Sequence, residues 1–353
     1  MFTILASCRP GSAFRFVALL GLVGMTASPA SAALLMHEAF DYTVGQNLSN
    51  QTHTPTGNQW LRPTAPAGAV HVIAAGDVNY DGLMESPPSN SLSLPRPSVS
   101  NQSENRINIP GRPYTRASDA SLFFSFTMEM TAFTNFGAVG SDTKNDAAAK
   151  NVTHRKGGFI GGFHGGEAST ATSMSLGTGF AGTIYTRREI DFDQTGTDGT
   201  PGTQTGRYEF GITKQAFPGT ATIADANTAF NTNLSFGVGE TVLVVGQYQF
   251  VDDAAGGNND IARLWINPTP GDASAEATPA WIAAAGSPNL AGALNLESFH
   301  FRSDTNSPGP FRIDNLRIGT SFLDVIPVPE PSTSLLLLAG ALLASGLARC
   351  QRS

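Results

Sequence analysis

The fold class of this chain is decided by the stretch Leu122-Phe123-Phe124-Ser125-Phe126-Thr127-Met128-Glu129-Met130. Apolar side chains stand at every second position from Leu122, a period that a β-strand satisfies and a helix does not. We therefore predict a strand whose core-facing row includes Phe126. Thr127 lies in the opposite row, where we expect an added charge to be mild.

Further strands are indicated on both sides of this stretch. Thr241–Phe250 is apolar on both faces at its start, so we expect it to be central in its sheet. A Gly- and Asn-rich turn at 254–260 then predicts a hairpin to the strand Ile261–Ile266. The remaining predicted strands are Leu35–Phe40, His71–Ala74, Gly158–Phe163, Tyr208–Ile212, Leu296–Phe301 and Phe311–Ile318.

Helical periodicity is nearly absent, with Ile223–Phe230 at most a short helix. Only 14% of the residues are charged, and the chain has 38 Gly and 22 Pro, a composition typical of turn-rich β proteins. Roughly 290 residues with many strands fit one large all-β antiparallel sandwich. We assign this domain to residues 33–325.

The N-terminus has the layout of a secretory signal peptide. Arg9 and Arg15 precede an apolar core at 16–25, and Ala30-Ser31-Ala32 supplies small residues at a cleavage site before Ala33. Residues 1–32 are thus predicted to be removed on export.

The C-terminus carries a second targeting signal. Pro329-Glu330-Pro331 is followed by an apolar run at 335–348, and then by Arg349 and Arg352. The run is shorter than the ~20 residues of a permanent span, and its arginines favour a cytoplasmic end. An ordinary C-terminal membrane anchor is the alternative.

Residues 326–353 resemble the PEP-CTERM sorting segment, a box with a short transmembrane helix and a basic tail. The resemblance implies export in a Gram-negative bacterium to the cell envelope, cell surface or extracellular matrix. It also implies an exosortase-type membrane protease as partner, with membrane contact through 335–348 before processing.

Charge and cysteine content narrow the function classes. The net charge is −7, and the four arginines of the terminal signals leave the part between them more acidic still. Such a surface disfavours nucleic acid, which needs clustered basic side chains. Both cysteines, Cys8 and Cys350, lie in segments predicted to be removed, so cysteine chemistry and disulfides are excluded from the mature protein.

Three stretches resemble concanavalin A-like, laminin-G-like jelly-roll domains. They are 75–83, with Ala75-Gly76-Asp77-Val78-Asn79-Tyr80-Asp81-Gly82-Leu83, the paired strands within 242–268, and the closing strand 311–322. The resemblance spans about residues 35–325. It implies a lectin-like jelly roll, which does not by itself imply sugar binding.

One motif would make this scaffold an enzyme. Glu189-Ile190-Asp191-Phe192-Asp193-Gln194 resembles the Glu-x-Asp-x-x-Glu signature of jelly-roll polysaccharide hydrolases, in which the first glutamate is the nucleophile and the last is the acid/base. Gln194 stands at the last position, and an amide can do neither proton transfer. Asp193 could substitute in a regular strand. We therefore favour a non-enzyme, with Glu189, Asp191 and Asp193 as weak catalytic candidates.

A calcium site is a further candidate. Asp77, Asn79, Asp81 and Gly82 reproduce the first positions of an EF-hand-type loop, whereas Pro88 occupies the position of the bidentate acid. A polar turn is the simpler interpretation, so Ca²⁺ is at most a possible cofactor.

The remaining candidates concern glycan binding. The six histidines show no zinc spacing, but His164 follows a glycine-rich stretch where a ligand could approach the backbone, although a surface loop is the favoured interpretation. Trp281, in the Pro-, Gly- and Ala-rich insert 268–288, is the better stacking platform, while Trp265 is expected in the core.

The residues thus leave two candidate functions from different classes. The first is a non-catalytic exported protein that binds matrix polysaccharide or has a structural role. The second is a polysaccharide hydrolase with a degraded signature.

Overall fold

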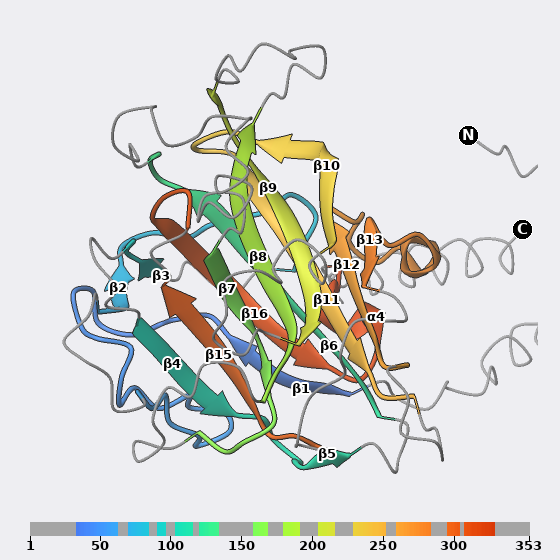
Figure 1. The fold of residues 1–353 in the computed structure, drawn as a ribbon. Helices are drawn as coiled ribbons and strands as arrows, with labels where there is room; N and C mark the ends of the chain where they lie inside the picture. The colour runs from blue at the N-terminus through green and yellow to red at the C-terminus, as the bar shows by residue number, and fades with distance from the viewer. Residues whose placement is uncertain are drawn as a thin grey trace, which may run out of the picture. The chain divides into compact units, whose positions relative to one another are not determined.

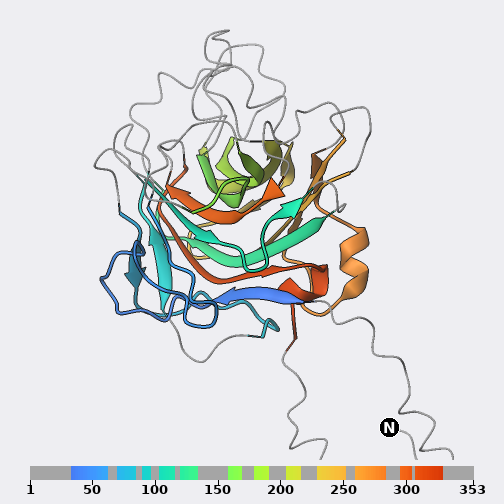
Figure 2. The same ribbon diagram turned by 90° about the horizontal axis from the view of Figure 1, so that it is seen from below.

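The alternating stretches build two antiparallel β-sheets that pack face to face (Figures 1 and 2). This computed structural model describes residues 33–62, 70–84, 90–96, 103–115, 120–133, 158–168, 179–190, 204–215, 229–251, 259–283, 295–303 and 307–328. All of them belong to one unit, Ala33–Val328. The predicted all-β antiparallel sandwich is confirmed.

The larger sheet has eight strands in the order β13-β12-β11-β6-β16-β3-β2, with β1 also paired to β16. Strand β16 changes neighbour along one edge, because Phe311–Ile313 pair with β3 and Leu316–Gly319 pair with β1. A bulge between Asp314 and Arg317 marks this change. The strands are β1 (Leu34–Glu38), β2 (Val72–Ala74), β3 (Ser91–Leu94), β6 (Ser121–Met130), β11 (Thr241–Gln249), β12 (Ile261–Ile266), β13 (Trp281–Ala283) and β16 (Phe311–Gly319).

The smaller sheet has six strands in the order β10-β9-β8-β7-β15-β4. Strands β5 (Tyr114–Thr115) and β14 (Asn295–Leu296) form a separate two-stranded sheet. The six strands are β4 (Ser103–Asn108), β7 (Gly158–His164), β8 (Phe180–Ile190), β9 (Gln204–Gln215), β10 (Ala229–Phe236) and β15 (Ser298–Ser303).

The main core lies between the two sheets. Phe124 and Phe126 of β6 meet Phe299 and Phe301 of β15 edge to face, with ring centroids 5.1 and 5.6 Å apart. All four side chains are completely buried. Each such burial contributes about 2 kcal/mol, so this layer stabilises the sandwich without any cysteine among the described residues.

A second apolar cluster covers the outer face of the eight-stranded sheet. We call this set the outer apolar cluster. Its strand residues are covered by helix α4 (Phe322–Val325), and the 3₁₀ helix η4 (Ala273–Ala277) accepts a 3.0 Å hydrogen bond from Trp265 Nε1 at Ala275. The members are Leu83, Phe123, Leu243, Val245, Trp265, Phe322, Val325 and Ile326.

The burial of Thr127 corrects one prediction. Thr127 was expected on a face that tolerates charge, but it is fully buried, and its hydroxyl donates to the carbonyl of Asp314 at 3.1 Å. The error arose because alternation identifies two faces without saying that one faces solvent.

Most predicted strands are confirmed, with shifts at their ends. Strand β11 is central between β12 and β6, as predicted, and β11 and β12 form the predicted antiparallel pair. The interval Leu296–Phe301 is divided between β14 and β15. The short helix proposed at Ile223–Phe230 is wrong at Ala229 and Phe230, which begin β10, while 223–228 lie outside the described residues.

Both targeting signals, residues 1–32 and Pro329 onward, lie outside the described residues. Within the described ranges, no helix is long and apolar enough to cross a membrane. The apolar helix predicted at 335–348 is therefore not tested.

Candidate functional site

The outer face of the six-stranded sheet gathers charged and aromatic side chains. On β15, Phe299 and Phe301 point into the core, so His300 and Arg302 point to the opposite face. Register then pairs His300 with Arg106 and Arg302 with Glu104 on the neighbouring strand β4. Strand β7 adds His164. We call Glu104, Arg106, His164, His300 and Arg302 the polar cluster.

One carboxylate serves two guanidinium groups in this cluster. Glu104 accepts a short hydrogen bond from Arg106 Nε and a 3.3 Å bond from Arg302 Nη1. Both arginine side chains are at most 1% exposed, and Glu104 is fully buried. Since Glu104 is the single carboxylate of the polar cluster, the cluster itself holds one guanidinium group more than it holds carboxylates.

Aromatic rings hold the guanidinium groups in place. Arg302 lies over the ring of Phe159 at 4.1 Å, and Arg106 lies over Phe180 at 5.5 Å. The His300 ring meets Phe180 edge to face, with centroids 4.6 Å apart. These cation–π and ring contacts orient the polar groups but use few of their N–H donors.

Hydrogen-bonding capacity therefore remains unused. Four buried atoms have no hydrogen-bond partner among the described residues: Arg106 Nη2, Arg302 Nε and Nη2, and His164 Nε2. The His300 ring nitrogens make no hydrogen bond of normal geometry, and the Gly162 backbone is their weak partner. Native interiors rarely leave such groups unpaired unless water, an ion or a ligand satisfies them. This concentration on one sheet face distinguishes it from the rest of the described interior.

Most of these atoms are donors. The Nδ1 atom of His164 lies 2.9 Å from the Gly166 amide and 3.3 Å from Arg106 Nη1, both of which donate hydrogen bonds. The Gly166 carbonyl, 3.2 Å from the same Nδ1, already accepts from the Ser298 hydroxyl at 2.6 Å. We therefore assign the His164 proton to Nε2, where it has no partner in the described part of the chain.

Both histidines are neutral at pH 7. Burial, reinforced by the Arg106 charge, lowers the pKa of His164 to about 3. The same two causes, in the same order, hold the pKa of His300 well below its usual value. A histidine with so low a pKa is a poor general base near neutrality.

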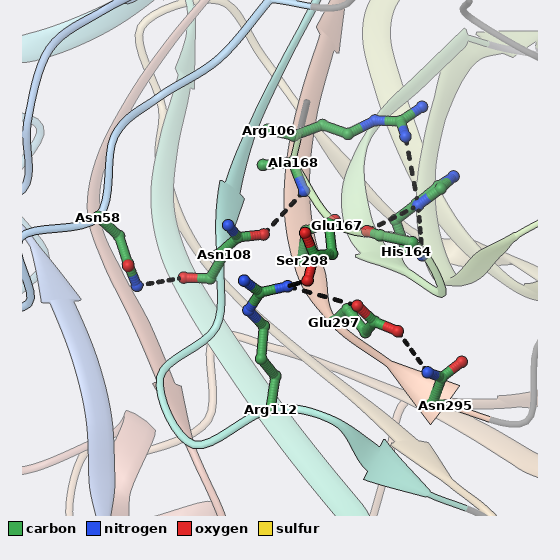
Figure 3. Close-up of polar contacts among 11 residues, drawn as sticks. Asn58, Arg106, Asn108, Arg112, His164, Glu167, Ala168, Asn295, Glu297 and Ser298 are labelled. Carbon is green, nitrogen blue, oxygen red and sulfur yellow. Dashed lines mark hydrogen bonds and ion pairs between the residues drawn. The ribbon is translucent and has the colours of Figure 1, made fainter. Parts of the chain in front are cut away.

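A more exposed rim borders the polar cluster (Figure 3). Arg112, which is 27% exposed, lies 2.6 Å from Glu167 and 3.3 Å from Glu297. The Asn108 side chain accepts from the Ala168 amide at 2.7 Å, and its carbonyl accepts from Asn58 at 2.8 Å. Since Asn108 follows Arg106 by two residues on β4, rim and cluster share one sheet face.

The described structure does not test the predicted hydrolase residues. Glu189 is the penultimate residue of β8, and Asp191, Asp193 and Gln194 lie outside the described residues. On the adjacent strand β9, the carboxylate of Glu209 forms a 2.9 Å ion pair with Arg187 of β8.

The calcium candidates lie in the turn that follows β2. Gly82 has a φ of +80°, as the sharp turn requires, but Asn79 and Asp81 are exposed. The turn is held from within the fold, since the Val78 amide donates to Asp314 Oδ2 at 3.2 Å and Arg312 donates to the Ala75 carbonyl at 3.0 Å. Among the described residues, no group of three or more His, Cys, Asp or Glu could hold a metal.

Both glycan candidates occupy positions other than those predicted. Trp281 begins strand β13 and packs against the inter-sheet core, so it is not a platform on an exposed insert. His164 ends a buried strand instead of a surface loop. The glycines before it leave no space for a ligand, because a Cβ at Gly161 would lie 2.9 Å from the His300 carbonyl oxygen and one at Gly162 would lie 2.9 Å from Thr183 Cα.

Sequence reasoning missed most of the polar cluster. A signal existed for His300, because Phe299-His300-Phe301 alternates within a predicted strand. No comparable signal marked Glu104 and Arg106, since Ser103-Glu104-Asn105-Arg106 has the composition of a solvated loop.

Comparison with known proteins locates the targeting signal. A family model described as the PEP-CTERM protein-sorting motif matches residues 327–353. This chain carries a PEP-CTERM sorting motif. Pro329, Glu330, Pro331, Arg349 and Arg352 all fall within the matched residues. The motif implies export, sorting to a bacterial cell surface and processing by an exosortase.

Several solved structures share a distant likeness with the sandwich. A mutant of alginate lyase Aly36B in complex with an alginate trisaccharide has a TM-score of 0.40 at 14% identity, covering 82% of this chain and 100% of that chain. The metal-free Emp46p carbohydrate recognition domain has a TM-score of 0.34 at 10% identity, covering 80% and 98%. A carbohydrate esterase from the Shiga toxin-encoding bacteriophage phi24B has a TM-score of 0.39 at 10% identity, covering 82% and 100%. No curated protein matches the sequence.

Proposed function

We propose that this exported protein binds an acidic polysaccharide of the cell surface or matrix without cleaving it, and that the outer face of the six-stranded sheet is the binding surface. The sorting motif supports the location. The observation that carries the proposal is the polar cluster, in which an excess guanidinium group stands beside buried donors that lack partners among the described residues.

The chemistry of these groups fits a carboxylate or sulfate. The guanidinium fork of arginine pairs with two oxygens of a carboxylate or sulfate through two parallel N–H bonds. His164 Nε2 and Arg302 Nη2 would add donors to the same anion. The rings of Phe159, Phe180 and Tyr185 form a small buried apolar cluster beside them.

The ligand would approach from the rim. Because the polar cluster is almost fully buried and Arg112 is partly accessible, a ligand would first contact Arg112. Binding in the cluster would then require a local conformational change. We therefore expect association slower than the ~10⁵–10⁷ M⁻¹s⁻¹ typical of preformed sites.

A non-catalytic role is favoured by the state of the acids and bases. Glycoside hydrolysis needs two carboxyl groups in reach of one bond. Glu104, the carboxylate of the polar cluster, accepts ion pairs from two arginines, and the low pKa of His164 makes it a weak base at pH 7. The alternative, hydrolysis by Glu189 with Asp191 and Asp193, is tested by the same experiment.

The experiment is a binding panel on the full exported protein. Polyuronates and sulfated glucans should bind with micromolar to millimolar affinity, neutral glucans should bind at least about tenfold more weakly, and no new reducing ends should appear. If the protein binds neither acidic nor neutral polysaccharides, the proposal is contradicted. Release of reducing ends, lost in Glu189→Gln, would establish the hydrolase instead.

A further inference from the structure

The sorting motif begins inside the folded sandwich. The matched motif starts at Pro327, whereas the described fold continues through Val328. Two residues therefore belong both to the folded unit and to the segment that the sorting machinery reads. We call Ile326–Val328 the latch.

Backbone hydrogen bonds fix the latch from two separate loops. The Gly271 amide donates to the carbonyl of Ile326 at 2.7 Å, and the Met84 amide donates to the carbonyl of Pro327 at 2.9 Å. Just before the latch, Ser125 Oγ donates to the carbonyl of Val325 at 2.5 Å. Three successive carbonyls are thus satisfied by residues distant in sequence.

Side-chain packing adds to this docking. Ile326 is fully buried in the outer apolar cluster, which also contains Leu83 and Trp265. Val328 lies directly on Gly271, where an added Cβ would stand 2.5 Å from Val328 Cγ1. Gly271 also has a φ of +73°, so both the turn and the seat for Val328 require glycine.

We propose that the latch competes with the processing protease for the start of the sorting motif. A protease binds its substrate as an extended chain and forms hydrogen bonds with the substrate backbone. The Pro327 carbonyl therefore cannot accept hydrogen bonds from the Met84 amide and from the protease at the same time. Processing then proceeds from the state in which the latch is locally open, at a rate set by the population of that state. This proposal does not depend on polysaccharide binding.

The test is pulse-chase labelling of the full chain in its own bacterium, following conversion of the unprocessed to the processed form. Ile326→Val and Ile326→Ala lie one residue outside the matched motif and weaken the latch in two steps. Leu83→Ala weakens its seat from a distant loop. Leu323→Ala is the matched control, because Leu323 is an exposed residue of α4 in the same region.

We expect conversion to accelerate about fivefold for Ile326→Val, at least about tenfold for Ile326→Ala and Leu83→Ala, and less than about twofold for Leu323→Ala. If Ile326→Ala does not accumulate as folded protein, the milder Ile326→Val decides. Conversion of Ile326→Val at the wild-type rate would overturn the proposal. So would an equal acceleration by Leu323→Ala, because it would reflect general loosening of the region.

Discussion

The outer faces of the two sheets are built differently. On the eight-stranded sheet, Phe123, Val245 and Trp265 are covered by α4, and the indole N–H has a carbonyl partner in η4. On the six-stranded sheet, the same depth of burial holds two arginines and two histidines with atoms unpaired among the described residues. The first arrangement stabilises the fold, whereas the second costs stability and is therefore expected to serve a ligand.

Arg317 limits this contrast. It lies on the eight-stranded sheet, fully buried, and burial lowers its pKa to about 10. Its Nη2 donates to the Met84 carbonyl, beside the latch, while Nε and Nη1 have no partner in the part of the chain that the structure describes. Arg317 has two unpaired nitrogens, which is fewer than the polar cluster has. The difference between the outer faces of the two sheets therefore remains.

The largest effect is expected where both sheets meet. Phe126→Asp would place a carboxylate without a partner in the inter-sheet core, at a cost comparable to the ~5–15 kcal/mol that stabilises a whole domain. Soluble yield should fall to background, with Phe126→Leu as the conservative control. Thr127→Asp should also fold poorly, because Thr127 is buried. Normal yield of Thr127→Asp would show that the outer face is not covered.

Truncation within the outer apolar cluster sharpens the comparison. Trp265→Ala should destabilise the protein by ~3–5 kcal/mol, since it removes contacts with Phe123 and Phe322 and the hydrogen bond from the indole N–H to the Ala275 carbonyl. Chemical denaturation measures this change. On the six-stranded sheet, His300→Leu should change the free energy of unfolding by at most about 1 kcal/mol, or raise it, because the ring nitrogens make no hydrogen bond of normal geometry. Similar losses for both variants would remove the distinction between the faces.

Removing the shared carboxylate tests the charge balance of the polar cluster. Glu104→Gln leaves two buried guanidinium groups without an anion and should cost about 3 kcal/mol. An acidic oligosaccharide should restore part of the lost thermal stability if it supplies the missing charge, whereas a neutral oligosaccharide should not. No loss of stability in Glu104→Gln would mean that the arginines do not depend on this carboxylate.

A further effect is a pH dependence of stability, which is small per pH unit. The pKa of His164 is about 6.5 in the unfolded chain and about 3 when folded, so the unfolded state binds more protons between these values. The stability linked to His164 is therefore complete above about pH 6.5 and is lost as the pH falls toward about 3, at ~1 kcal/mol per pH unit. His164→Gln should flatten the decline of the denaturation midpoint in this acidic range relative to the wild type. An unchanged pH profile would contradict the burial of a neutral imidazole at this position.

The sandwich is easier to predict from the sequence than the site, for a physical reason. In strands such as β6, β11 and β12, apolar residues alternate with polar ones or fill consecutive positions. This pattern predicts directly which side chains are buried. Strand β4 is polar in sequence yet buried, because its charged side chains pack against Arg302 and aromatic rings on other strands. Which charges meet depends on the register between β4 and β15, and one strand's sequence does not contain that information.

The outer apolar cluster was missed for a related reason. Phe322, Val325 and Ile326 come from a segment that has no strand or helix periodicity of its own, and Leu83 comes from the suspected calcium loop. Their shared position becomes visible only when the chain is folded.

The central claim is that the polar cluster binds an acidic polysaccharide, and a titration of the full exported protein with a polyuronate oligosaccharide tests it most directly. Arg302→Met should weaken binding at least about tenfold, because it removes the excess guanidinium group while keeping the apolar stem over Phe159. Arg207→Met, on β9 of the same sheet and 41% exposed, should leave the affinity within about twofold. Equal affinities of the wild type and Arg302→Met would contradict the account.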